Sequence, residues 1–130
     1  MRTQTGTYVP DMVSPNPVPP QPVPLELSHR LLPTGEVVAD IGGELDMATA
    51  DTAARYVQRI ISSHRGPVSV DLAGIRFCDA QGLHALLRMA NYAEQLGFPF
   101  HVTSPTPMLA KLMRITGVGY RLRAPGAGER

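Results

Sequence analysis

The sequence predicts a single α/β domain in which helices pack on a mixed β-sheet, with the element order β-β-α-β-α-β-α. The chain has 130 residues, 43% of them hydrophobic, which suits one compact domain with a buried core. Short apolar runs alternate with stretches whose apolar residues recur every three or four positions, a pattern typical of strands followed by helices. A strand–helix–strand order implies parallel neighbours joined by a right-handed crossover.

The two ends of the chain differ in composition from the middle. Seven of the 13 prolines lie between Pro10 and Pro24. Since proline lacks an N–H donor and favours extended backbone before it, residues 1–24 are predicted to be a disordered tail. We interpret this tail as a spacer, and a ligand for a proline-binding groove is the alternative. Residues 124–130 are predicted to be a flexible C-terminal tail, which leaves residues 25–123 as the folded domain.

The folded part is predicted to begin with an antiparallel hairpin. Residues 25–31 form the first strand, residues 33–35 (Pro-Thr-Gly) the turn and residues 36–41 the second strand. The glycines and acidic residues of 42–46 are predicted to break the strand pattern. A helix is expected over residues 49–64, in which Asp51 and Arg55 form an i,i+4 ion pair.

The second half repeats the alternation of strands and helices. Residues 68–72 form a central strand that residues 74–77 extend, and a helix follows over residues 81–95. Residues 98–102 alternate as a further strand. Thr106 and Pro107 suit the cap and first position of a third helix that ends at Gly117. Its expected apolar face is Met108, Leu109, Leu112, Met113 and Ile115, and residues 120–122 are assigned to an edge strand.

The bulk composition excludes several classes of function. A formal net charge of +1 gives no electrostatic reason to expect nucleic acid or a membrane surface as a partner. The single cysteine, Cys78, cannot form an internal disulfide and suits a reducing compartment. The chain has no apolar signal core at its N-terminus and no run near the ~18 residues that span a bilayer. We expect a cytoplasmic protein.

Two loops are candidates for a functional site because both follow strands expected to be parallel neighbours. Residues 43–46 (Gly-Glu-Leu-Asp) follow the second strand, and residues 78–82 (Cys-Asp-Ala-Gln-Gly) follow the third. The carboxyl ends of such strands meet at one edge of the sheet, so Asp46 and Asp79 should lie close together. Each also has a structural explanation, Asp79 as a helix N-cap and Asp46 as a turn carboxylate.

Catalysis is the weaker interpretation of this pair of carboxylates. Two aspartates can divide acid and base roles, so a small enzyme or nucleotide binder that uses Asp46 and Asp79 stays an alternative. The loops offer no activated nucleophile, no phosphate-binding glycine loop and no set of residues at metal-ligand spacing. Cys78 is interpreted as a buried filler whose pKa Asp79 would raise. We expect no cofactor and no metal.

Three parts of the sequence stand out together: the Gly-Glu-Leu-Asp loop, the alanine-rich helix that follows it and the stretch Val68 to Leu83. In this combination they resemble the STAS domain of bacterial anti-sigma factor antagonists. The resemblance covers about residues 25–122. It implies a protein-binding function, in which the loop after the third strand and the helix that follows dock onto an anti-sigma factor with a kinase-like ATP-binding fold. Docking in that family releases a sigma factor, which would make this chain a regulator of transcription.

The resemblance also identifies where this sequence departs from the family. The usual loop reads Asp-Ser-Ser-Gly or Asp-Ser-Thr-Gly, and the partner phosphorylates the hydroxyl residue before the glycine to end binding. Here the two positions are Ala80 and Gln81, so no phosphorylation of the loop is expected. The residues expected to contact the partner are Asp46, Asp79, Ala80, Gln81, Gly82, His84 and Arg88. The alternative use of the same fold is a subunit of a lipid or ABC transporter, or of a scaffold assembly.

Overall fold

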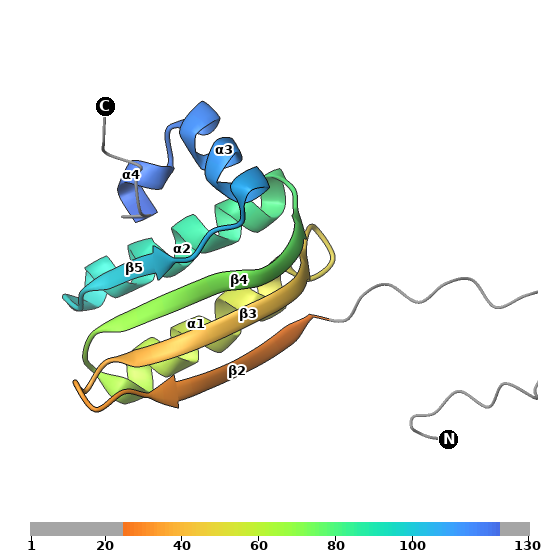
Figure 1. Ribbon diagram of the computed structural model, residues 1–130. Helices are drawn as coiled ribbons and strands as arrows, with labels where there is room; N and C mark the ends of the chain where they lie inside the picture. Colours follow the sequence, from red (N-terminus) through yellow and green to blue (C-terminus); the bar gives the residue numbers. More distant parts are fainter. Residues whose placement is uncertain (1–24, 123–130) are drawn as a thin grey trace, which may run out of the picture.

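One mixed β-sheet of four strands organises the part of the chain that the computed structural model describes, residues 25–122. The predicted tails, residues 1–24 and 124–130, lie outside the described residues. Strand β2 (Glu26–Leu31) pairs antiparallel with β3 (Val37–Leu45), which runs parallel to β4 (Val68–Cys78). Strand β5 (Phe100–Thr103) completes the sheet parallel to β4 (Figure 1). The predicted single α/β domain with a mixed sheet is confirmed.

Two long helices cover one face of this sheet. Helices α1 (Ala50–His64) and α2 (Ala80–Leu96) lie side by side behind the strands in Figure 1. The short helices α3 (Pro107–Thr116) and α4 (Gly119–Leu122) follow β5, and α4 packs against α2 and β5. Within residues 25–122, no helix is both long enough and apolar enough to cross a membrane.

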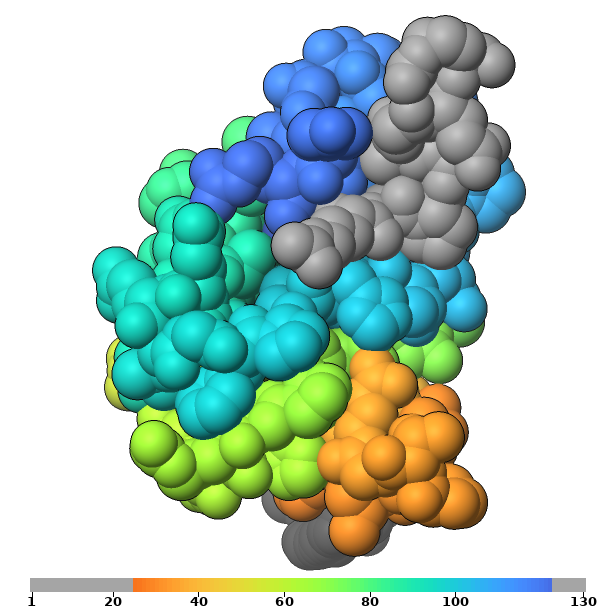
Figure 2. All heavy atoms as spheres, turned by 90° about the vertical axis from the view of Figure 1, so that its left-hand side faces the viewer, coloured from red at the N-terminus to blue at the C-terminus, as the bar shows by residue number. Residues whose placement is uncertain are grey.

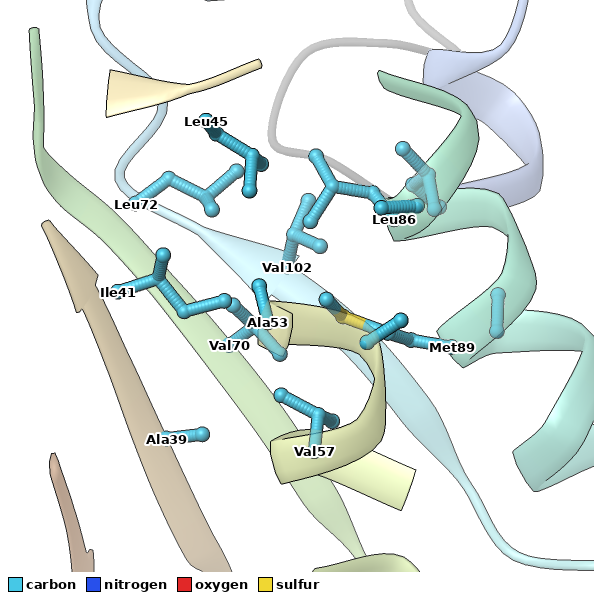
Figure 3. Close-up of a cluster of buried hydrophobic side chains, with 14 of the residues drawn as sticks. Ala39, Ile41, Leu45, Ala53, Val57, Val70, Leu72, Leu86, Met89 and Val102 are labelled. Carbon is cyan, nitrogen blue, oxygen red and sulfur yellow. The ribbon is translucent and has the colours of Figure 1, made fainter. Parts of the chain in front are cut away.

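The core fills the space between the sheet and the two long helices (Figure 3). Its largest fully buried side chains include Ile41 and Leu45 of β3, Leu72 of β4, and Leu86 and Met89 of α2. Burying each such side chain contributes about 1.5–3 kcal/mol, so this layer supplies most of the drive to fold. The core position predicted for Cys78 is confirmed, since that residue is buried beneath the start of α2.

The opposite face of the sheet is polar. Asp40 and Asp71 are neighbours across β3 and β4, and both are partly exposed. Arg30 of β2 reaches across them, with its Nε 3.2 Å from an oxygen of Asp40 and an Nη 3.7 Å from an oxygen of Asp71. Alternation of apolar and polar residues along the first half of β4 and along β5 therefore assigns one face to the helices and the other to the polar side.

Several predicted boundaries are wrong for identifiable reasons. The second strand continues to Leu45, because Gly42 pairs with Gly74 across a register shift and Gly43 adopts a φ of +89°. The glycines bend the strand without ending it. Residues 120–122 form the last turn of α4 rather than an edge strand, since the N–H of Leu122 donates to the carbonyl of Val118 at 3.1 Å.

The third helix buries a narrower stripe than its sequence suggests. Leu109 and Met113, one turn apart, are buried as predicted, whereas Ile115 is 70% exposed and Met108 is 43% exposed. Helix α3 lies at the margin of the sheet, where it contacts α4, and only one side of it meets the core. The predicted Thr106 cap is confirmed by a hydrogen bond of 3.3 Å from the N–H of Leu109 to the Thr106 hydroxyl.

Candidate functional site

The two candidate loops meet at the carboxyl ends of β3 and β4, as the topology predicted. Leu45 and Cys78 are register partners at the last position of each strand. The N–H of Asp79 donates to the carbonyl of Leu45 at 3.3 Å. The N–H of Met47, the residue after Asp46, donates to Oδ2 of Asp79 at 3.2 Å. Asp79 is thus hydrogen-bonded to the loop that contains Asp46.

Asp79 has two structural roles, one for each carboxylate oxygen. Its Oδ1 accepts from the N–H of Gly82 at 2.9 Å, which caps the start of α2 as predicted. Its Oδ2 accepts from Met47 on the neighbouring loop. One side chain therefore caps the N-terminus of α2 and links the β3–α1 loop to the β4–α2 junction.

Asp46 organises its own loop, as the turn-carboxylate interpretation predicted. Its Oδ1 accepts from the N–H groups of Ala48 at 2.9 Å and Thr49 at 3.2 Å. Thr49, which the sequence interpretation missed, donates its hydroxyl to the carbonyl of Glu44 at 2.7 Å and accepts from the N–H of Asp46 at 3.0 Å. The Asp-x-x-Thr spacing ahead of a helix was the available signal for this reciprocal arrangement.

Gly82 sets the distance between α2 and β3. A Cβ at this position would lie 2.1 Å from the carbonyl oxygen of Leu45 and 2.9 Å from Sγ of Cys78. Only a residue without a side chain allows the first turn of α2 to approach the end of the strand this closely. Gly82 is buried, so its effect on any contact surface is to position the residues beside it.

The solvent-facing side of this junction consists of residues from both loops and from α2. Ala80, Gln81 and His84 are exposed, and Arg88 is partly exposed. Met47, which the sequence interpretation did not select, is 78% exposed at the tip of the β3–α1 loop. We call Met47, Ala80, Gln81, His84 and Arg88 the exposed rim. Figure 2 shows the other end of the sheet, where the β2–β3 hairpin and the α1–β4 turn lie.

A cluster of three charged side chains joins the exposed rim to α1. Arg88 of α2 places Nη1 3.3 Å from Oδ1 of Asp51 on α1, and Arg55 bonds the other oxygen of Asp51. The predicted i,i+4 pair is therefore present and is shared with a second arginine. Hydrogen bonds from Arg55 and then Arg88 lower the pKa of Asp51 below its usual value, so Asp51 is ionised at neutral pH.

The cysteine at this junction has the properties of a core residue. Burial, and secondarily the charge of Asp79, raise the pKa of Cys78 to about 12. Its thiol is therefore protonated at neutral pH and is a weak nucleophile. Among residues 25–122, no three His, Cys, Asp or Glu side chains are grouped closely enough to hold a metal ion.

Comparison with solved structures finds the same fold in several proteins. An anti-sigma factor antagonist from Mycobacterium paratuberculosis is 22% identical, with a TM-score of 0.66 over 78% of this chain and 85% of the other. The antagonist SpoIIAA in its unphosphorylated form is 17% identical, with a TM-score of 0.61 over 76% of this chain and 87% of the other. Murine Slc26a9, an anion transporter, is 14% identical, with a TM-score of 0.58 over 80% of this chain and 21% of the other.

Sequence comparison identifies the family. No curated protein matches the chain. A family model described as "Mlab, STAS domain" matches residues 32–123, which include both loops of the junction and all of the exposed rim. The structural likenesses agree with this match, since two of the three are to antagonists with the same arrangement of sheet and helices. The chain belongs to the STAS domain family.

Proposed function

We propose that this chain is a regulatory protein-binding module of the anti-sigma factor antagonist type. Its exposed rim binds an anti-sigma factor with a kinase-like ATP-binding fold, and this binding releases a sigma factor in the cytoplasm. The likeness to SpoIIAA and to the M. paratuberculosis antagonist supports the proposal. The junction supports it further, because Asp46 and Asp79 are occupied by backbone donors and hold a surface in place rather than a reacting group.

The absence of a hydroxyl group from the loop at residues 79–82 carries the part of the proposal that concerns how binding is controlled. Ala80 and Gln81 occupy the positions where the family resemblance puts two hydroxyl residues, the second of them the phosphorylated one, and both are exposed. The hydroxyl of Thr49, in the neighbouring loop, is partly buried and bonded to Glu44. A phosphate would add about −1.5 to −2 charges inside an interface, which ends binding by repulsion and desolvation. Without an acceptor, binding is controlled by abundance or competition instead.

A pair of matched glutamate substitutions tests where the partner binds. The kinase-fold anti-sigma proteins of the source organism are purified in turn, and their affinity for the full chain is measured by calorimetry. Met47→Glu places a charge on the exposed rim, while Leu31→Glu changes a residue of similar exposure, 68%, at the far end of β2. Burying an unpaired carboxylate in an interface weakens binding by about tenfold or more, so Met47→Glu should do so and Leu31→Glu should not. Equal affinities for the two variants would contradict the proposal.

A transporter-associated role is the second candidate function. It is favoured by the family description, "Mlab, STAS domain", and by the likeness to a segment of an anion transporter that amounts to 21% of that protein. In this case the chain would be a subunit of a lipid or ABC transporter, or of a scaffold assembly. Affinity purification of the full chain followed by mass spectrometry separates the two. An ABC-type ATPase as the stoichiometric partner favours the second function, and a kinase-fold protein favours the first.

A further inference from the structure

The carboxylates of the junction are partly occupied by their own backbone. Asp79 accepts one backbone N–H on each oxygen. Asp46 accepts two on Oδ1. Each of these lone pairs is no longer available to a basic group from outside. The neighbouring helices supply the other charges near the exposed rim.

Those helices present mainly positive charge. The N-terminal turns of α1 and α2, residues 50–60 and 80–91, contain three arginines (Arg55, Arg59 and Arg88) and one acidic residue, Asp51, while the loops before them add Glu44, Asp46 and Asp79. On the face of the sheet away from the helices, Asp40 and Asp71 lie on either side of one arginine, Arg30. The chain is nearly neutral as a whole, with a net charge of +1, so the positive charge of these helices is a local feature.

A single carboxylate cannot satisfy the two guanidinium groups that converge on it. Arg55 and Arg88 each bond Asp51, and each guanidinium has five N–H donors in a fixed planar arrangement. The Arg55 side chain is 67% exposed and the Arg88 side chain is 38% exposed. Asp51 thus holds two arginines in position beside the rim while leaving donor groups that suit bidentate carboxylates.

We infer that the partner surface facing α1 and α2 is acidic and that its carboxylates bind Arg55 and Arg88. This inference rests on the proposed function, because it specifies the chemistry of the protein that docks on the exposed rim. A protein surface fits better than nucleic acid. Two arginines bonded to one aspartate do not form a continuous phosphate-binding track, and the chain has no tryptophan and few other aromatic residues for base stacking.

Association kinetics of charge variants test the inference. The probe is the purified kinase-fold anti-sigma protein that binds the full chain, immobilised for surface plasmon resonance at several salt concentrations. Arg55→Glu should slow association by about tenfold and flatten its salt dependence, since charge complementarity acts mainly on the association rate. Asp51→Asn removes the one competing carboxylate, so it should speed association. Lys111→Glu, which makes the same charge change as Arg55→Glu on the exposed side of α3, is the matched control and should leave the rate unchanged.

The outcomes separate this inference from the proposed function. If Met47→Glu weakens binding but Arg55→Glu and Asp51→Asn leave association unchanged, the rim is the interface and the acidic partner surface is wrong. Faster association of Arg55→Glu would show a basic partner surface and would also overturn the inference. If no kinase-fold protein binds the full chain, the proposed function fails and this inference fails with it. Binding of duplex DNA or anionic vesicles that Arg55→Glu abolishes would replace the acidic protein with a phosphate-bearing partner.

Discussion

Replacing Gly82 by alanine tests the close approach of α2 to β3 on which the junction depends. A Cβ at residue 82 would lie 2.1 Å from the carbonyl oxygen of Leu45. Even a C–H···O contact keeps carbon and oxygen about 3.3 Å apart, so the helix and strand must separate by roughly 1 Å. That displacement should stretch the hydrogen bond between Met47 and Asp79, because its donor and acceptor belong to the two loops that move apart.

The expected loss of stability follows from three contributions. Overpacking a close contact costs about 1–3 kcal/mol. Weakening of the Asp79 cap adds about 1 kcal/mol, and the better helix propensity of alanine returns up to about 1 kcal/mol. The net destabilisation is about 2 kcal/mol, which lowers the melting temperature of a domain of this size by roughly 10 °C.

Thermal unfolding followed by circular dichroism measures this loss, and hydrogen exchange at the Met47 amide reports the junction directly. The control is Gly97→Ala at the end of α2, where φ is +83° and a Cβ would meet nothing within 4 Å. That variant loses only the stability that alanine costs in a left-handed conformation, about 1–2 kcal/mol. Its hydrogen exchange at the Met47 amide should equal that of the wild type. Unchanged or higher stability of Gly82→Ala, with wild-type exchange at Met47, would refute the close approach.

Three further predictions concern the residues around Gly82. Asp79→Ala removes a helix cap and the bond to Met47, so urea denaturation should show a loss of about 1–2 kcal/mol, and wild-type stability would contradict both roles. Thr49→Val should lower the free energy of unfolding by about 1 kcal/mol in the same assay, because it leaves the Glu44 carbonyl without its donor. Thr49→Ser keeps the hydroxyl and should not lower it. Equal losses of stability in the two variants would show that packing, not the hydrogen bond, is responsible. Iodoacetamide at pH 8 should modify Cys78 only after denaturation, since the native pKa is raised to about 12 from 9.0; rapid native modification would contradict its burial. The stabilisation linked to this raised pKa is present below pH 9 and lost as the pH rises towards 12.

Much of the fold could be predicted because the core elements have strong, uniform patterns. Helices α1 and α2 and strand β4 bury apolar residues at regular spacing, and turn residues such as Gly66-Pro67 and Gly97 separate them. The meeting of the two loops also followed from topology, because parallel neighbouring strands end at the same edge of a sheet. The Asp79 cap was predictable since an aspartate preceded a helical pattern.

The remaining features depend on tertiary contacts that local patterns do not encode. Two consecutive glycines led to the prediction that the strand ends, but pairing with β4 continues β3 past them to Leu45. Residues 120–122 have strand-like composition, but Leu122 is buried within a helical turn, and Arg121 bonds Asn91 of α2. Met47 could not be selected from sequence, because its position at the exposed rim arises only when the loop is tied to Asp79.

The most direct test is the affinity of the full chain for its kinase-fold partner before and after incubation with Mg-ATP, with intact-mass measurement of phosphate. The wild-type chain should gain no phosphate and keep its affinity, because Ala80 and Gln81 offer no hydroxyl group. Gln81→Ser, the positive control, should gain one phosphate and bind more weakly. Phosphate on residues 79–82 of the wild-type chain, or an affinity that falls after its incubation with Mg-ATP, would contradict the account.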